Sequence, residues 1–494
     1  MVDPRLSQAS INITTRFPVP LNEFKTHQKL FDAQLNLADA PASLPVANST
    51  RSFWLHPSDE VNPLARKGST GPLTSDADIC IIGSGITGVS AAYHLSKMSP
   101  NKKIVMLEAR DFCSGATGRN GGHLTAGIFL HLRNYVEEMG LTEALKNYAL
   151  ERHTSSAILS IIQENGLEVA VDLVSGGHID MFFTDEEVKE GRADFALAEN
   201  SGAKVDKVKW LSKEEMSAKY GTSYAAVQIP GHNLWPLKLV TQIFYITQKM
   251  FSSSAGSLNL HTNTPVTAVS SSTTRRLWTL TTPRGTITCS TVVHATNAYA
   301  SHLLPQLAGP RGIVPVRGQV LATRAAASLD TIGRSSWGGN EGFEYWFPRP
   351  PKVASDEEKP LVILGGGREA VQDYEFGISD DSEVNAQAGR ALRAFLPTVF
   401  PGRYDEGSEP EMEWTGIMGY TSTRDPFVGP VLSADGSEIP GQYISAGYTG
   451  HGMPRAYACA EVVASLITSD FAGKRDRWTI PEWLPKRYLT WNRV

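Results

Sequence analysis

The chain has 494 residues, with 46 lysines and arginines against 51 aspartates and glutamates, so its formal net charge is −5. With 41% apolar and 20% charged residues, the composition is that of a globular protein, and it excludes disorder and a strongly basic nucleic-acid-binding surface. The N-terminus has no secretory leader pattern, and no apolar run reaches about 18 residues, so we expect a cytoplasmic protein without a membrane partner. The four scattered cysteines form no CxxC pair, which predicts neither a disulfide framework nor a metal site.

Residues 1–72 are rich in Pro, Ser and Asn and show little periodicity. Within them, Phe53, Trp54 and Leu55 predict that part of this N-terminal extension is strapped over the folded protein. A mobile tail is the alternative, and the residues alone leave both open.

The rest of the chain alternates between two kinds of pattern. Apolar runs at 78–82 and 103–108 predict buried parallel strands. Further strands are expected at 177–183, within 258–295 and 313–376, and at 443–446, and helices at 86–98, 142–165, 186–200, 236–250, 386–396 and 455–468. Parallel βαβ material interrupted by antiparallel material predicts an α/β protein with two interleaved domains.

A glycine-rich turn follows the first strand. Gly83-Ser84-Gly85-Ile86-Thr87-Gly88 has the spacing G-x-G-x-x-G, in which the glycines allow a tight turn, close approach of a pyrophosphate and helix packing. The amides at the start of the helix hold the phosphates. Glu108 ends the second strand, twenty residues after Gly88, where a carboxylate accepts hydrogen bonds from ribose hydroxyls. These features predict a Rossmann-type dinucleotide site.

Three further small-residue segments favour FAD over a nicotinamide cofactor. They are 113–123, 291–298 and 447–453, each able to offer backbone amides to an extended cofactor. A nicotinamide dehydrogenase is the alternative, and it would be colourless when purified.

At these residues the chain resembles the D-amino-acid-oxidase-type FAD-dependent oxidoreductases, the group of glycine, sarcosine and γ-glutamylputrescine oxidases. The resemblance runs from about residue 76 to the C-terminus, and the loop 115–122 (Gly-Ala-Thr-Gly-Arg-Asn-Gly-Gly) is most similar to the γ-glutamylputrescine-oxidase-like branch. With its long extension, the whole resembles a fungal member.

The resemblance implies a Rossmann-type FAD-binding domain interleaved with an antiparallel-sheet substrate domain. The expected segments are an extension (1–72), FAD-binding parts at 73–175, 236–312 and 411–494, the last including a C-terminal tail, and substrate-domain parts at 176–235 and 313–410. The cofactor-binding residues implied are Gly83, Gly85, Ile86, Thr87, Gly88, Glu108, Ala109, Arg110, Thr117, Gly118, Arg119, Asn120, Gly121, Val266, Ala295, Thr296, Gly450, His451, Gly452 and Met453.

The implied chemistry is oxidation of a C–N bond in a small amine or amino acid by hydride transfer to flavin N5, which gives an imine. Some relatives attach flavin through a cysteine before a Tyr-Thr pair, but Ile417-Met418-Gly419 precedes Tyr420-Thr421 here, so we expect non-covalent FAD. Some oxidase relatives carry an oxygen-activating lysine before a glycine run, but 361–364 contains none. Oxygen as the electron acceptor therefore stays a hypothesis.

Candidate substrate-side residues come from segments expected near the flavin. His123 and Tyr345 are the candidate catalytic residues, and Tyr299, Arg349 and Arg368 the candidate substrate ligands. An aromatic wall would favour a neutral amine and an arginine would bind a carboxylate bidentately. Core packing or a solvated charge is the alternative for each. At the level of function, a tailoring oxidase of secondary metabolism and a flavin-binding protein without turnover remain open.

Overall fold

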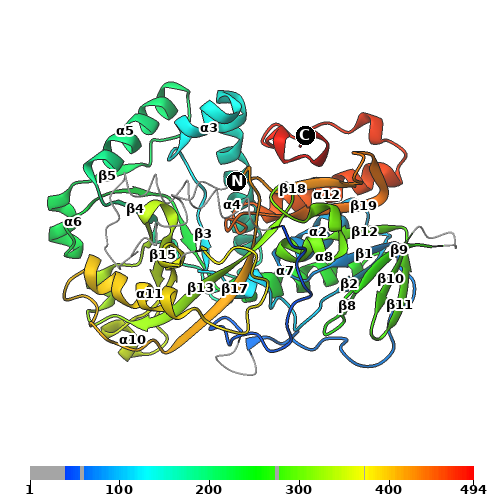
Figure 1. Ribbon diagram of the computed structural model, residues 1–494, viewed down its shortest axis with the longest axis horizontal. Coiled ribbons are helices and arrows are strands. Elements are labelled where there is room, and N and C mark those ends of the chain that lie inside the picture. The colour runs from blue at the N-terminus through cyan, green and yellow to red at the C-terminus, as the bar shows by residue number, and fades with distance from the viewer. Residues whose placement is uncertain (1–38, 56–60, 273–277, 372, 494) are drawn as a thin grey trace, which may run out of the picture.

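The computed structural model describes residues 39–55, 61–272, 278–371 and 373–493. Two domains lie side by side, each built on its own sheet (Figure 1). Each sheet takes strands from segments far apart in the chain, which confirms the predicted interleaved arrangement. Residues 1–38 of the extension lie outside the described residues.

The first domain contains a six-stranded sheet of the Rossmann type. Its strands, in spatial order, are β18 (Phe427–Leu432), β19 (Glu438–Ala446), β12 (Thr291–His294), β1 (Ile79–Ile82), β2 (Lys103–Leu107) and β8 (Ser257–His261). All neighbours pair in parallel except β18 and β19. The β1 and β2 residues are almost all buried, as expected of strands covered on both faces.

Helices cover one face of this sheet and a small antiparallel sheet covers the other. Helices α2 (Ile86–Met98), α7 (Pro236–Ser252) and α12 (Ala456–Phe471) share one apolar core with the strands, and α4 (Leu141–Glu164) packs against α12. The strands β9 (Ala268–Ser271), β10 (Trp278–Thr282) and β11 (Gly285–Cys289) form the opposite layer. Among the described residues, none of the helices has both the length and the apolar character needed to cross a bilayer.

The second domain contains an eight-stranded sheet. Its spatial order is β17 (Met412–Tyr420), β13 (Val314–Arg324), β16 (Leu361–Gly366), β15 (Glu344–Pro348), β14 (Ser336–Gly339), β4 (His178–Phe182), β6 (Ala225–Ile229) and β5 (Lys209–Leu211). The pairs are antiparallel except β14 with β4. The domain also carries α3 (Leu132–Met139), α5 (Asp185–Asn200), α6 (Lys213–Tyr220), α9 (Leu329–Ile332), α10 (Ala354–Glu358) and α11 (Ala386–Val399), while α8 (Ala300–Leu303) follows β12.

One segment boundary differs from the expectation. The strand β17 was expected in the last FAD-binding part, 411–494, but it pairs with β13 along the edge of the second sheet, from Val314–Tyr420 to Ala322–Met412. The long β13 needs a partner on that edge, and only the pairing across about ninety residues, not the local pattern, places β17 there.

The described part of the N-terminal extension packs on the protein. Trp54 is fully buried and stacks edge-on against Trp235, whose Nε1 donates a hydrogen bond to the Trp54 carbonyl at 2.9 Å. The C-terminal run is likewise seated on the core, with Leu484, Tyr488 and Leu489 buried. The predicted strap is therefore confirmed for residues 39–55.

Candidate active site

A cavity of about 1010 Å³ joins the two domains. This volume lies near the upper end of the roughly 300–1,000 Å³ usual for ligand pockets. Its lining begins at Glu108 and Val266, beside the Rossmann sheet, and reaches Tyr345 and Arg368 on the second sheet. The cavity therefore extends over both domains, with a place for a cofactor at one end and for a substrate at the other.

The glycine-rich turn forms one wall of this cavity. Gly83 has φ +108°, and a Cβ on it would lie 2.6 Å from the Ala295 carbonyl oxygen, so only glycine fits between β1 and β12. Gly85 precedes α2, and no side chain caps that helix in the part of the chain described. The start of α2 therefore presents backbone amides at the cavity wall, the arrangement that binds phosphate groups.

Glu108 lies directly after β2, as the turn motif requires. Its Oε2 accepts hydrogen bonds from the amide (3.0 Å) and the hydroxyl (2.8 Å) of Ser84, and its Oε1 accepts one from the Arg110 amide (3.0 Å). These bonds fix the carboxylate, and Glu108 is part of the cavity lining. That is the position expected for contacts to ribose hydroxyls, and this role stays a proposal.

Two of the candidate cofactor residues do not line the cavity. A Cβ on Gly88 would lie 2.0 Å from the Gly83 carbonyl oxygen, and one on Gly118 would lie 2.3 Å from the Cys113 carbonyl oxygen. Both glycines therefore act by allowing close packing, Gly88 between α2 and the turn and Gly118 within the loop. The other eighteen candidate cofactor residues line the cavity.

The loop after β19 reaches the cavity from the other side. His451 Nε2 lies 3.2 Å from Glu151 Oε2, and Arg455 Nε lies 2.8 Å from Glu151 Oε1. Burial raises the pKa of Glu151, but His451 and Arg455 outweigh it and hold that pKa at about 2. The buried carboxylate on α4 thereby anchors the 450–453 loop and the start of α12.

His123 and Tyr345 meet in the wall on the substrate-domain side. Their rings are 5.6 Å apart and nearly perpendicular, and His123 Nδ1 lies 3.0 Å from the Gly121 carbonyl oxygen. Burial, reinforced by the neighbouring His178, lowers the pKa of His123 to about 3, and burial raises that of Tyr345 to about 12. Both groups are therefore neutral at physiological pH, and this wall carries no charge of its own.

A polar pair beside them also lines the cavity, and it was not among the residues predicted from the sequence. His178 Nε2 is 3.1 Å from Asp180 Oδ1, and His178 Nδ1 is 2.8 Å from the Ser336 hydroxyl. Burial raises the pKa of Asp180, but His178 lowers it below the ordinary range. The two residues alternate on β4 and share one face of it, so the His-x-Asp spacing in the predicted strand was the available signal.

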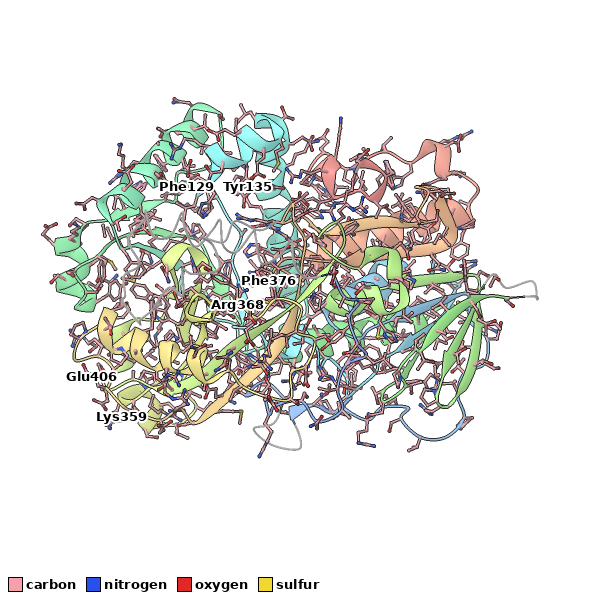
Figure 2. The ribbon with its side chains drawn as sticks, in the orientation of Figure 1. Phe129, Tyr135, Lys359, Arg368, Phe376 and Glu406 are labelled. Carbon is pink, nitrogen blue, oxygen red and sulfur yellow. The ribbon has the colours of Figure 1, made fainter. Side chains whose placement is uncertain are left out.

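The three candidate substrate ligands have different surroundings. Arg368 lines the cavity near the middle of the view in Figure 2, and its Nη2 donates to the Tyr420 hydroxyl at 2.8 Å. Tyr299 lines the cavity too, with its hydroxyl donating to the Ser379 carbonyl at 3.4 Å. Arg349 does not lie where a substrate ligand is expected. It is outside the cavity lining, paired with Asp172 and packed 5.0 Å from the Trp235 ring. Arg349 comes directly after β15, where the local pattern gives no sign of which way its side chain points.

A pair of buried acids supports the Arg368 turn. Glu344 is fully buried, its Oε2 accepts from Asn340 Nδ2 at 2.8 Å and its Oε1 from the Gly367 amide at 3.1 Å. Burial, and then the adjacent carboxyl of Glu369, raise the pKa of Glu344 well above its ordinary value. Two carboxylates cannot both stay charged there, so Glu344 keeps its proton at neutral pH.

Glu344→Gln is expected to remove a pH dependence of stability without disturbing the fold. The folded pKa of Glu344 lies above the unfolded value of 4.5, so the native state holds the extra proton and its stability falls as the pH rises past that value. Glutamine has nearly the same size and shape as a protonated glutamate, and it does not titrate. The free energy of unfolding, measured with urea, should fall less from pH 5 to pH 8 in the variant than in the wild type. The exposed Glu358→Gln serves as the control, and equal slopes in all three proteins would contradict the retained proton.

The lining fits a flavin dinucleotide. The glycine turn, the helix start without a side-chain cap and Glu108 suit an ADP moiety, while the Thr296 hydroxyl is buried without a hydrogen-bond partner among the described residues. An orphan polar group of this kind is explained when a ligand completes it. The fold and the cavity thus define a dinucleotide-binding protein.

Comparison with known proteins makes the class specific. The family model for FAD dependent oxidoreductases (DAO) matches residues 78–466, so the chain belongs to that family. The chain is 24% identical over 407 residues to a probable oxidoreductase, OrdL, of Rhizobium meliloti, with 80% of this chain and 84% of that protein covered. It is 23% identical over 413 residues to the gamma-glutamylputrescine oxidoreductase of Escherichia coli, with the same shares covered.

Solved structures share the fold. Glycine oxidase from Geobacillus kaustophilus superposes with a TM-score of 0.61 at 19% identity, covering 84% of this chain and 99% of that one. L-proline dehydrogenase from P. horikoshii gives a TM-score of 0.63 at 19% identity, with 85% and 98% covered. An L-alpha-glycerophosphate oxidase from Mycoplasma pneumoniae with FAD bound gives 0.60 at 16% identity, with 84% and 99% covered. These likenesses confirm the predicted combination of a Rossmann FAD domain and a sheet domain.

Proposed function

We propose that the protein oxidises a C–N bond of a small amine or amino acid, using non-covalently held FAD. The observation that carries this proposal is the single cavity that joins the dinucleotide turn to the neutral aromatic and histidine wall and to Arg368. Support comes from related proteins named for amines and amino acids, such as gamma-glutamylputrescine oxidoreductase, glycine oxidase and L-amino acid deaminase.

FAD, when bound, supplies a hydride acceptor, N5 of the flavin, which a carbon bearing nitrogen reduces. The protein's part is to bind and orient the amine. His123 and Tyr345 are both neutral near pH 7, and such a wall favours an uncharged amine over an ammonium ion because it gives no compensating charge. A neutral amine has the free electron pair that hydride loss requires, and the resulting imine is hydrolysed by water.

The low pKa of His123, about 3, also excludes it as a group that titrates between pH 5 and 8. We propose that His123 lines the substrate side of the cavity. Its Nδ1–H would donate to the Gly121 carbonyl and so hold the end of the loop formed by residues 113–121. Tyr345 keeps its phenolic proton and can donate it to a substrate atom. Its ring fills the space against Gly121 and Gly365, where a Cβ on either glycine would lie 2.3 Å from it.

Arg368→Met is expected to raise KM for carboxylate-bearing amines by about ten- to hundredfold, since a hydrogen bond to a charged group contributes about 1.5–3 kcal/mol. KM for amines without a carboxylate should change little. Steady-state kinetics on a matched pair of substrates, with and without the carboxylate, checks this. Arg390→Met, an exposed change on α11, is the control, and equal effects on both substrates would refute the carboxylate role.

The positions of the cysteines support the proposal of a non-covalent flavin. All four are free and buried, and none of Cys80, Cys113, Cys289 and Cys459 lines the cavity. Met418, in the segment where some relatives carry the linking cysteine, lines it instead. We propose that trichloroacetic acid precipitation releases all of the flavin into the supernatant; yellow colour in the pellet would contradict this.

Oxygen as acceptor, a cytoplasmic location and a fungal source are further parts of the proposal. They rest on the family resemblance and on the sequence. A tailoring oxidase of secondary metabolism would share the same cavity, and a panel that includes peptide- and alkaloid-like amines separates it from an oxidase of simple amines.

Product analysis tests the proposed reaction. Incubation with amines, amino acids and N-methyl amines should yield one carbonyl product for each ammonia or amine released, as hydrolysis of an imine requires. If oxygen is the acceptor, one hydrogen peroxide forms per carbonyl. Turnover of hydroxyl-bearing substrates with no release of nitrogen would overturn the C–N assignment.

A further inference from the structure

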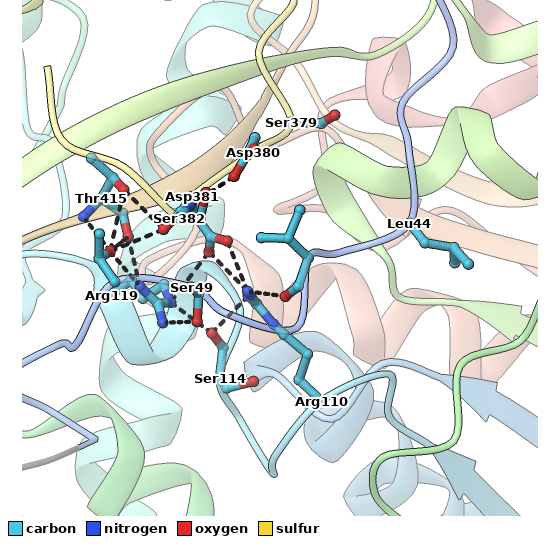
Figure 3. Close-up of polar contacts among 12 residues, drawn as sticks. Leu44, Ser49, Arg110, Ser114, Arg119, Ser379, Asp380, Asp381, Ser382 and Thr415 are labelled. Carbon is cyan, nitrogen blue, oxygen red and sulfur yellow. Dashed lines mark hydrogen bonds and ion pairs between the residues drawn. The ribbon is translucent and has the colours of Figure 1, made fainter.

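The N-terminal strap, residues 41–55, crosses the cofactor loop formed by residues 113–121 (Figure 3). It precedes residues 78–466, which the family model matches. Several of its hydrogen bonds go to this loop, to Arg110 beside it and to the backbone of the buried Asp381. Other contacts of the strap reach Thr415 and Trp235.

Two buried arginines are held between the strap and Asp381, which is fully buried (Figure 3). Arg110 Nη1 lies 2.8 Å from Asp381 Oδ1, and Arg119 Nε lies 3.4 Å from Asp381 Oδ2. Both guanidinium groups also donate to the Ser114 carbonyl of the cofactor loop, at 3.0 and 2.9 Å. Arg110 and Arg119 both line the cavity.

The strap completes the bonding of these arginines. Arg119 Nη2 donates to the Ser49 hydroxyl at 2.6 Å, and Arg119 Nη1 to the Thr50 hydroxyl at 3.2 Å. Arg110 Nη1 donates to the Val46 carbonyl at 3.3 Å. The Thr50 amide in turn donates to the Asp381 carbonyl at 2.7 Å. Removing the strap would leave buried guanidinium donors unsatisfied, which is costly.

The strap also fixes the loop backbone directly. The Ser52 hydroxyl donates to the Gly118 carbonyl at 2.7 Å, and Trp54 Nε1 donates to the Asn120 carbonyl. Leu55 Cδ2 packs close to Gly118: it lies 2.9 Å from the position that a Cβ on this glycine would take. Further along, Leu44 and Pro45 themselves form part of the cavity wall.

We propose that residues 41–55 are part of the FAD site, with Ser49 and Thr50 as positioning residues for Arg119 and with Leu44 and Pro45 closing the cavity wall. The inference rests on the proposed function only in that FAD is the occupant of the cavity. The strap holds the loop in its binding conformation before the cofactor arrives. Preorganisation of this kind lowers the dissociation constant because less ordering is needed on binding.

The test measures FAD binding to the full-length apoprotein, without any amine, by the change in flavin fluorescence. Ser49→Ala/Thr50→Val removes both hydroxyls, and the loss of two hydrogen bonds to a charged partner predicts a dissociation constant raised about tenfold or more. The hydroxyl-retaining Ser49→Thr/Thr50→Ser should restore tight binding. Asn48→Ala, exposed within the same strap, should bind FAD as the wild type does.

A dissociation constant unchanged in the double variant overturns the inference, as does equal weakening in the hydroxyl-retaining pair. If the double variant does not fold by circular dichroism, Leu44→Ala at the cavity wall decides in its place. Weaker FAD binding by it supports the strap as part of the site, and wild-type binding overturns it. Because no substrate is present, failure of the C–N oxidation proposal would leave these constants unaffected.

Discussion

Gly88→Ala is expected to abolish FAD retention and to destabilise the protein by about 3 kcal/mol, the upper part of the range for overpacking. A Cβ at Gly88 would lie 2.0 Å from the Gly83 carbonyl oxygen and 3.1 Å from its carbon. Both neighbours are backbone, so the strain is relieved only by moving α2 away from the turn. That movement displaces the amides at the start of the helix. Flavin content after gel filtration and the urea midpoint measure the two effects.

A matched change on the same helix gives the control. Ser90 is fully buried, and its hydroxyl has no hydrogen-bond partner among the described residues. Ser90→Ala should therefore be neutral or slightly stabilising, and should keep the flavin, because no hydrogen bond is lost. Retention of flavin by Gly88→Ala would show that the contact between helix and turn does not govern cofactor binding.

Glu151→Ala should cost about 3–5 kcal/mol, because it leaves the buried Arg455 without its partner. The same carboxylate makes the free energy of unfolding of the wild type depend on pH in the acid range. Its pKa of about 2 lies below the ordinary 4.5, so its contribution is present above pH 4.5 and is lost as the pH falls toward 2. Glu151→Gln should lack this slope. Denaturant unfolding between pH 3 and pH 6 checks both statements.

The double variant Glu151→Leu/Arg455→Met separates the pair from its surroundings. Replacing a buried ion pair by apolar side chains of similar size is often neutral or stabilising, so this variant should recover most of the stability lost in Glu151→Ala. It should still hold flavin less tightly if the pair fixes the 450–453 loop. A double variant as unstable as the single one would mean that loss of packing, rather than an unpaired charge, explains the cost.

Much of the cofactor site could be predicted from the sequence, because its determinants are local. The spacing of Gly83, Gly85 and Gly88 after an apolar strand, and of Glu108 at the end of the next, follows from backbone geometry over about thirty residues. The structure places Gly83, Gly85 and Glu108 in the cavity lining and Gly88 outside it, where Gly88 has the helix-packing role that the motif gives its third glycine.

The remainder depends on contacts that no local pattern encodes. Asp381 lies in a polar stretch with no sign that it is buried against Arg110 and Arg119, more than two hundred and fifty residues earlier. Arg349 follows the end of β15, where the local pattern does not tell which way the side chain points, and it pairs with Asp172. The pairing of β17 with β13 is likewise not encoded locally, since the two strands are distant in sequence.

The most direct test of C–N oxidation is anaerobic mixing of the purified yellow protein with a panel of amines, amino acids and N-methyl amines. Without oxygen the measurement is independent of the acceptor. At least one amine should bleach the flavin absorbance near ~450 nm with saturable kinetics, faster as the pH rises through the amine's own pKa, because the wall of His123 and Tyr345 favours the neutral form. Flavin that stays oxidised with every amine, yet is reduced by dithionite, would contradict the proposal.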